Sequence, residues 1–163
     1  MRFIKSDYQK IAGAFILLLT VIVFLNKGLA QQSTPKEIIK AKLKNHYKAI
    51  ESHDFDNVRP YYADKLTYYY GNQNVSRDRD LPISFKRYWN DVVKEEKHEI
   101  DWNSMQYEND KEGNHIVRFT FKYSFKLRKP KKEEEKNQWK TYNHKAELHF
   151  DKNYQIYYVK RRF

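Results

Sequence analysis

The sequence predicts one α+β domain in which helices pack on a curled antiparallel sheet and enclose a cone. Two observations predict this fold class. Apolar residues recur every three or four positions in two stretches between residues 35 and 92, as in amphipathic helices. From residue 98 onward apolar and polar residues alternate, as in strands with one buried face. Helices followed by a series of strands are typical of α+β domains.

Residues 1–30 differ in kind from the rest of the chain and have the three regions of a secretory signal peptide. Three basic residues fall within the first ten positions, an apolar run covers 11–25, and small residues precede and include Ala30. We expect cleavage after Ala30 and an exported product, periplasmic or secreted, that begins at Gln31. The alternative is a membrane anchor formed by residues 11–25. A helix of that length rises only about 22 Å, short of the roughly 30 Å hydrocarbon core, which favours cleavage.

The rest of the chain has the size of one domain. Residues 31–36 are interpreted as a lead-in and residues 37–163 as the domain, which is long enough to bury a core without covalent cross-links. The chain has no cysteine, so disulfides and thiolate metal sites are excluded. It has only four glycines, no phosphate-binding loop and no Gly-x-Ser-x-Gly motif. No cofactor and no metal are therefore predicted.

Local signals place the helices. Thr34 to Glu37 form a capping box with proline at the first helical position, and the apolar stripe that follows ends near Ile50. A short second helix is expected at 56–62, limited by Pro60. A third is expected to become regular only after Pro82. Its buried stripe is predicted to consist of Phe85, Tyr88, Trp89 and Val92.

The strands are predicted from alternation and from turn residues. We expect strands at 66–70, from 98 onward, at 115–129, at 142–150 and at 154–163, with turns at 71–74, 110–114 and 151–153. The longest would span roughly 50 Å if flat. So small a domain cannot hold a flat strand of that length, so we expect this strand to curl through a bulge and the sheet to form a cone.

Segments 46–50, 52–56, 61–64 and 66–70 resemble the helix, acidic break, Ala-Asp step and first strand of the NTF2-like superfamily. This superfamily is also called SnoaL-like or ketosteroid-isomerase-like, and its fold is the cone-shaped, cystatin-like α+β fold. The resemblance covers residues 38–159. Residues 69–71, 75–77 and 88–89 are similar to NTF2-like modules found beside bacterial kinase and envelope proteins. The resemblance implies the fold more than the activity, since the superfamily includes isomerases, dehydratases, hydrolases, transport factors and binding modules.

The resemblance also implies roles for two tyrosines. Tyr47 falls where ketosteroid isomerases keep the tyrosine that donates to the developing oxyanion, and Tyr70 falls where they keep the carboxylate base. A phenol with an ordinary pKa of about 10 is a poor base near neutral pH, so the isomerase proton shuttle is expected to be missing. An alternative isomerase, dehydratase or lyase would use His144 as base with Tyr47 as donor, provided that both reach one cavity.

Our main hypothesis is a non-catalytic binding or interaction module of the cell envelope with an aromatic-lined pocket for a small apolar or aromatic ligand. Aromatic residues make up 17% of the chain, and 14 of them are tyrosines, whose hydroxyls suit a pocket better than a packed core. Each of these residues also has a purely structural interpretation as packed core. The residues predicted to line the pocket are Tyr47, Tyr62, Tyr70, Tyr88, Trp89, Tyr123, Tyr142 and His144.

The chain is basic, with a formal net charge of +11, but it contains no recognisable nucleic-acid-binding motif, so no nucleic-acid partner is expected. The outer face of the longest strand carries a cationic row, Arg118, Lys122, Lys126 and Arg128. This row could bind an anionic envelope component, or it could be a solvated face that prevents aggregation. A homodimer is a further expectation, although a charged outer face disfavours pairing through that strand.

Overall fold

The computed structural model describes residues 33–162, of which the segment from Pro35 onward forms one compact unit. The predicted signal peptide or anchor therefore lies outside the described residues. Within 33–162, no helix combines the length and apolar character needed to cross a bilayer.

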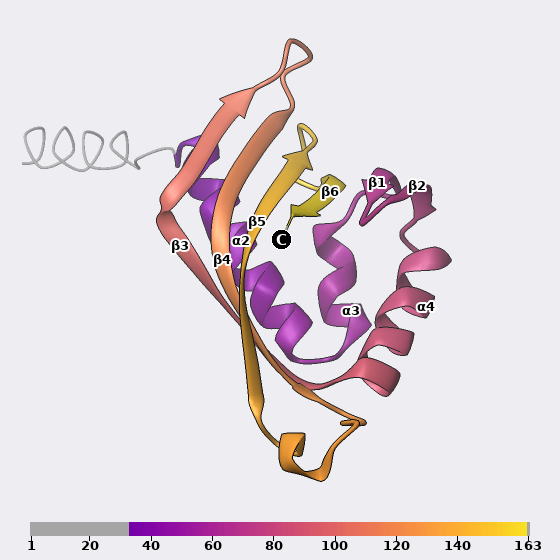
Figure 1. Cartoon of the computed structure of the whole chain (residues 1–163). Helices are drawn as coiled ribbons and strands as arrows, with labels where there is room; N and C mark the ends of the chain where they lie inside the picture. The colour runs from indigo at the N-terminus through magenta and orange to yellow at the C-terminus, as the bar shows by residue number, and fades with distance from the viewer. Residues whose placement is uncertain (1–32, 163) are drawn as a thin grey trace, which may run out of the picture. The chain divides into compact units, whose positions relative to one another are not determined.

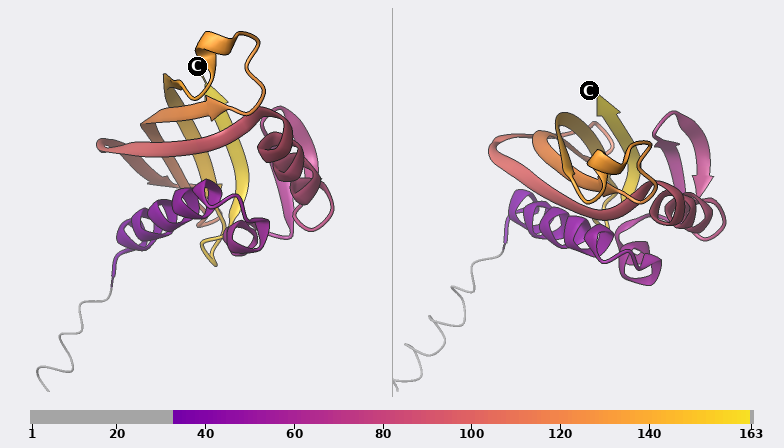
Figure 2. Two further views of the ribbon diagram at one scale, coloured as in Figure 1. Left: turned by 90° about the horizontal axis from the view of Figure 1, so that it is seen from below. Right: turned by 60° about the horizontal axis from the view of Figure 1, so that its bottom comes forward.

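The first helix, α2, spans Pro35–Glu51 and begins where the capping box predicts (Figure 1). Its apolar stripe, from Ile39 to Ile50, is buried and includes His46. The short helix α3, Phe55–Val58, is capped by Asp54, whose carboxylate accepts from the Asp56 amide at 3.0 Å. A 3-10 turn, η1, follows at Arg59–Tyr61, where Pro60 ends regular α-helix. Figure 2 shows α2 lying across one face of the curled sheet.

The next helix, α4, spans Asp80–Arg87 and continues into a π-helical turn, η2, at Tyr88–Val92. The expectation that regular helix begins only after Pro82 was wrong. A proline in the first turn removes an N–H that has no intrahelical partner, so it does not delay the helix. Val92, expected on the buried stripe, is 42% exposed because the π-turn rotates the last positions away from the core.

Six strands form one sheet in the order β2-β1-β6-β5-β4-β3. Their bounds are Lys65–Tyr69 for β1, Asn72–Ser76 for β2, Val93–Asn109 for β3, His115–Leu127 for β4, Trp139–Phe150 for β5 and Ile156–Arg162 for β6. The α+β fold class is confirmed. The sheet is mixed, because β1 pairs in parallel with β6 while the other pairs are antiparallel.

Strand β2 lies where the sequence predicted only a turn. The turn is shorter than expected and consists of Tyr70 and Gly71, both with positive φ (48° and 98°). Only after it does the chain pair back on β1, with Asn72 opposite Tyr69. Polar residues are uncommon in strands, but an edge strand with one buried side chain tolerates them.

The sheet curls strongly, as expected, but the irregularity lies on β3 rather than on β4. The register between these strands shifts between Asp101 and Gln106, opposite Thr120 and Arg118. The extra residues on β3 lengthen one side of the ladder and bend the pair. Ser104, inside the bulge, supplies the hydroxyl that accepts from the Thr120 amide at 2.8 Å, so the bend keeps its hydrogen bonding. The curled sheet and the helices together leave a hollow on the concave face.

Candidate ligand cavity

A cavity of about 600 Å³ lies inside the cone. Residues from α2, from the β1–β2 hairpin, from α4 and η2, and from strands β3, β4 and β6 form its wall. The wall is mainly aromatic, with a few polar groups between the rings. Its residues are Tyr47, Ile50, Tyr68, Tyr69, Tyr70, Gly71, Asn72, Ser84, Phe85, Tyr88, Glu96, His98, Phe121 and Arg161.

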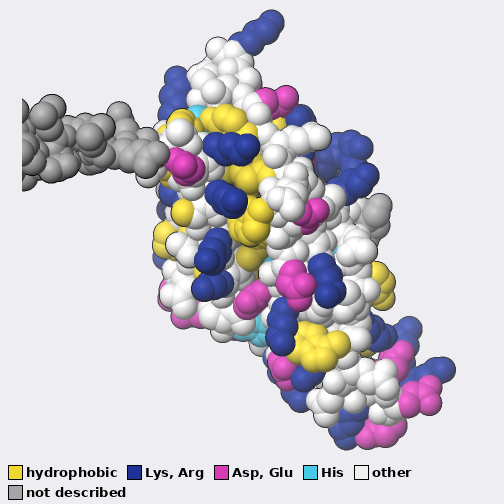
Figure 3. Space-filling view, turned by 90° about the vertical axis from the view of Figure 1, so that its left-hand side faces the viewer, with side chains coloured by type: hydrophobic (Ala, Val, Ile, Leu, Met, Phe, Trp, Pro, Cys, Tyr) yellow, Lys and Arg dark blue, Asp and Glu magenta, His cyan; other side chains and the backbone are white. Residues whose placement is uncertain are grey.

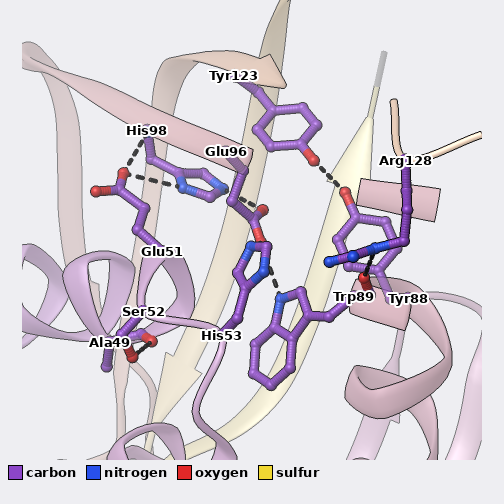
Figure 4. A network of polar contacts seen from close by, with 10 residues as sticks. All are labelled: Ala49, Glu51, Ser52, His53, Tyr88, Trp89, Glu96, His98, Tyr123 and Arg128. Carbon is purple, nitrogen blue, oxygen red and sulfur yellow. Dashed lines mark hydrogen bonds and ion pairs between the residues drawn. The ribbon is translucent and has the colours of Figure 1, made fainter. Parts of the chain in front are cut away.

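Glu96 is the buried carboxylate of this wall (Figure 4), with only 2% of its side chain exposed. Its Oε1 accepts from the Trp89 indole N–H at 2.9 Å and lies 3.2 Å from Nε2 of His53, whose ring stacks on Trp89. Burial raises the pKa of Glu96 to about 7, although hydrogen bonds from Trp89 and Tyr123 oppose the rise. Glu96 can therefore gain or lose a proton near neutral pH.

His98 stands next to Glu96 on the same face of β3, with its Nε2 3.8 Å from Glu96 Oε2. Its other ring nitrogen faces Glu51 Oε1 at 3.3 Å, and the same oxygen accepts from the His98 amide at 2.5 Å. Glu51, the last residue of α2, thus ties the helix to the strand. Burial lowers the pKa of His98, with Glu51 acting in the opposite direction, so the ring is neutral near pH 7.

Arg161 on β6 brings a cation into the cavity wall. Its guanidinium lies over the rings of Tyr123 and Phe121, at 4.6 and 5.2 Å from their centroids. Its Nε is buried and has no hydrogen-bond partner. The guanidinium interacts with the Tyr70 hydroxyl and lowers the pKa of this phenol, against a larger rise caused by burial. Tyr70 is nonetheless 48% exposed as a whole, so it forms part of the cavity's rim.

Six of the eight residues predicted to line the pocket divide into two groups. Tyr47, Tyr70 and Tyr88 are on the wall. Tyr62, Trp89 and Tyr123 are buried beside it: the Tyr62 hydroxyl contacts His46 Nε2 at 3.0 Å, and the Tyr123 hydroxyl contacts that of Tyr88. Ligand binding by any of these residues stays a prediction.

The last two predicted residues lie on β5, away from the wall. Tyr142 was expected to point inward, but it is 50% exposed. It lies near the start of β5, where the helices no longer cover the sheet. His144 is buried and packs against Phe121 and Tyr123, and it is not among the wall residues. Of the two residues that the alternative enzyme would use, only Tyr47 lines this cavity, and their joint role stays a prediction.

Sequence reasoning missed two charged groups of the wall, Glu96 and Arg161, and it placed His98 at a strand start without assigning it to the pocket. Glu96 was overlooked because the strand was expected to start at His98, whereas β3 starts at Val93. With that start, Glu96 and His98 share the parity of Ile100 and face inward. Arg161 lies two residues after the buried Val159, so alternation along β6 places it on the inner face. For Glu96 and Arg161 the alternation of the strand indicated an inward side chain, but charged residues are usually exposed.

The predicted cationic row lies outside the cone and is largely neutralised by neighbouring strands. Arg118 pairs with Glu108 and Glu147 at 2.5 and 2.8 Å. Lys122 and Lys126 pair with Glu99 and Glu95 at 3.4 and 3.0 Å, and Arg128 donates to the Trp89 carbonyl at 2.7 Å. Figure 3 shows basic and acidic side chains intermixed on one face of the molecule. Binding of an anionic polymer through this row stays a prediction.

Comparisons with known proteins identify the fold. No family model matches the sequence, and no curated protein matches it. An NTF2-like superfamily protein from Salmonella enterica serovar Typhimurium LT2 has a similar structure, with a TM-score of 0.59 at 10% identity over 78% of this chain and 89% of that one. A candidate scytalone dehydratase from Novosphingobium aromaticivorans DSM 12444 matches with a TM-score of 0.59 at 8% identity, covering 76% and 80% of the two chains. A candidate SnoaL-like polyketide cyclase from Shewanella denitrificans OS-217 matches with a TM-score of 0.53 at 18% identity, covering 78% and 90%. The chain therefore has the NTF2-like fold that its sequence resembles.

Proposed function

We propose that this domain binds a small, flat organic molecule in its cone, as an exported binding module of the cell envelope. The observation that carries the proposal is the cavity of about 600 Å³ with aromatic walls. Small-molecule sites are typically concave, roughly 300–1,000 Å³ in volume and lined by apolar and aromatic groups with a few polar ones.

The composition of the wall supports a flat ligand. The rings of Tyr47, Phe85 and Phe121 offer stacking and edge contacts, which aromatic molecules use best. The hydroxyl of Tyr88 and the side chains of Glu96 and Asn72 provide hydrogen bonds that orient the guest.

The proposal that the protein is exported rests on the sequence of residues 1–30. N-terminal sequencing tests it: the mature product should begin at Gln31, and a membrane-bound product starting at Met1 would contradict it.

A tryptophan at Ser84 is expected to block the cavity. Ser84 lies in the middle of α4, is exposed and belongs to the wall, so an indole there would occupy the space that a ligand needs. We expect Ser84→Trp to weaken the binding of 2-naphthol, a neutral flat probe, at least about tenfold, which corresponds to about 1.4 kcal/mol. Isothermal titration calorimetry of both proteins measures the change.

Ile83→Trp is the matched control for this experiment. Ile83 is the preceding residue of α4, is 66% exposed and is not part of the wall, so the same indole there leaves the cavity open. The control should bind 2-naphthol as the original protein does. Equal affinities for all three proteins would place the binding elsewhere, and no binding to the original protein would contradict the proposed cavity for this class of molecule.

A second candidate function, acid–base catalysis on the bound molecule, is favoured by one observation, the pKa of about 7 of the wall carboxylate Glu96. Its carboxylate could take a proton from a carbon next to a carbonyl group, while the C–H electron pair moves toward the carbonyl oxygen and Arg161 stabilises the negative charge. Exchange of the α-hydrogens of 2-tetralone for deuterium, followed by NMR, tests it. Exchange that persists in Glu96→Gln would exclude Glu96 as the base.

A further inference from the structure

Arg161 is a cation inside the cavity that no carboxylate of the described residues neutralises. None of the ion pairs within residues 33–162 includes it, and the Nε of its guanidinium is buried without a hydrogen-bond partner. The neighbouring Arg118 and Arg128 differ, because the first pairs with two glutamates and the second donates to a carbonyl. Arg161 is thus held in the wall with hydrogen-bonding capacity to spare.

A buried or half-buried charge is unfavourable unless a partner of opposite charge or a set of hydrogen bonds compensates for lost hydration. The rings of Tyr123 and Phe121 compensate partly, since a guanidinium over an aromatic face is attracted to it. This stacking also fixes the plane of the guanidinium, whose N–H groups donate along its edges. An edge of this kind matches the two oxygens of a carboxylate.

We propose that the ligand of the cone is an aromatic carboxylate, whose acid group is bound by Arg161 and whose ring lies among the tyrosines and phenylalanines of the wall. This inference rests on the proposed function, because it assumes that the cavity takes a ligand, and it adds the ligand's charge. The Tyr70 hydroxyl, which interacts with the same guanidinium, stands at the rim beside the expected position of the acid group.

Glu96 is not the missing partner of Arg161. Its Oε1 is engaged by Trp89 and His53, and its Oε2 faces His98. The Glu96 carboxylate and the Arg161 guanidinium form no ion pair within residues 33–162, and burial raises the pKa of Glu96 to about 7 although the guanidinium acts to lower it. When Glu96 is protonated, no carboxylate of the described wall is ionised, Arg161 keeps its positive charge, and burial lowers the pKa of the other basic group, His98. An anionic guest would then meet a net positive cavity.

This arrangement links anion binding to the proton on Glu96. Charged or titratable groups face Glu96 from every neighbouring element: Glu51 at the end of α2, His53 just after it, Tyr69 on β1, Tyr70 just after it, Tyr88 on η2, His98 on β3, Tyr123 on β4 and Arg161 on β6. None of these neighbouring groups removes the repulsion between an ionised Glu96 and a carboxylate guest. Affinity for the anion should therefore fall as pH rises from 6 to 8, and it should become flat in Glu96→Gln.

The test compares 2-naphthoate with its neutral amide, 2-naphthamide, by calorimetry at pH 6. The two probes have the same ring and nearly the same shape, and 2-naphthoate stays ionised because ordinary carboxyl groups have a pKa of about 4. We expect 2-naphthoate to bind about tenfold to a hundredfold more tightly, as charge-assisted hydrogen bonds allow. Arg161→Gln should lose this preference while its affinity for 2-naphthamide stays the same, which also shows that the cavity is intact. Arg161→Lys should keep part of the preference, because the charge remains and the fork is lost.

Arg162→Gln is the matched control, because Arg162 is the next residue of β6 and lines a separate hollow of about 600 Å³ on the outer face. It should leave both affinities unchanged. Loss of 2-naphthoate binding in Arg162→Gln, with Arg161→Gln unaffected, would move the anion to the outer hollow and overturn the proposal. Equal affinity of the original protein for acid and amide would overturn it while leaving the proposed function intact. Binding of neither probe would contradict both.

Discussion

Replacing Trp89 with alanine is expected to lower the free energy of unfolding by about 3–5 kcal/mol. The indole is 5% exposed, stacks on His53 and packs against Phe85 at 4.8 Å between ring centroids. Removing it leaves a void in the core, and it also takes the hydrogen-bond donor away from Glu96. Urea denaturation followed by circular dichroism measures the loss, because the signal does not depend on this tryptophan.

Trp89→Phe separates the two contributions. Phenylalanine keeps most of the packing and removes the N–H donor, so we expect a smaller loss of about 1–3 kcal/mol, the usual range for a buried polar group left without its partner. A loss below about 1 kcal/mol for the alanine variant would mean that the indole lines open space rather than packed core. Such a result would contradict the structure, in which Trp89 lies behind the cavity wall and not on it.

The helices and most strands could be predicted because their signals are local. The capping box at residues 34–37 sets the start of α2, and the alternation from His115 onward sets β4. The edge strand β2 could not be predicted in this way, because its identity depends on the turn at Tyr70 and Gly71 and on a neighbour that is distant in sequence. Pairing of β1 with β6 is likewise a long-range contact that no local pattern encodes.

The site was predicted less well than the fold, for a physical reason. Alternation along the strands and helices indicates which aromatic side chains face the inside of the cone. It does not indicate whether an inward side chain is packed core or lines open space, so Tyr62 and Tyr123 could not be separated from Tyr47 and Tyr88. Charged residues in strands are usually exposed, so Glu96 and Arg161 were not predicted to line the cavity. They became visible only when the curled sheet showed that the inner face is not completely filled.

Four histidines of this domain have pKa values below the ordinary value. Burial lowers the pKa of His46 to about 3 and that of His144 to about 4, and it lowers the pKa values of His53 and His98 as well. Each contributes stability that is present above the ordinary histidine pKa of about 6.5 and is lost as pH falls. The pKa of Glu96 is raised instead, so its contribution to stability falls as pH rises. A substitution at Glu96 can therefore separate its contribution from that of the histidines.

Glu96→Gln is expected to stabilise the domain by about 3 kcal/mol at pH 8 and to change its stability little at pH 4. The pKa of Glu96 is about 7 in the folded protein against 4.5 as the ordinary value. Between pH 4.5 and about pH 7 the Glu96 side chain is ionised in the unfolded chain and protonated in the folded protein, so the free energy of unfolding falls as pH rises. The fall amounts to about 1.4 kcal/mol for each pKa unit. Glutamine is never ionised and should avoid this loss, while its carbonyl oxygen still accepts from the Trp89 indole.

The measurement is urea denaturation of both proteins at pH 4, 6 and 8. The quantity of interest is the difference between them, in which the contributions of His46 and His144, which make no ion pair with Glu96 in the described part of the chain, cancel. Glu95→Gln is the matched control, because Glu95 is the neighbouring residue of β3 and its side chain is 47% exposed. Its ion pair with Lys126 is a surface pair, so we expect a change below about 1 kcal/mol at each pH. A difference between the original protein and Glu96→Gln that stays constant from pH 4 to pH 8 would show that Glu96 keeps its ordinary pKa. Anion binding in the cone should then lose its dependence on pH between 6 and 8, because a permanently ionised Glu96 would repel the guest equally throughout this range.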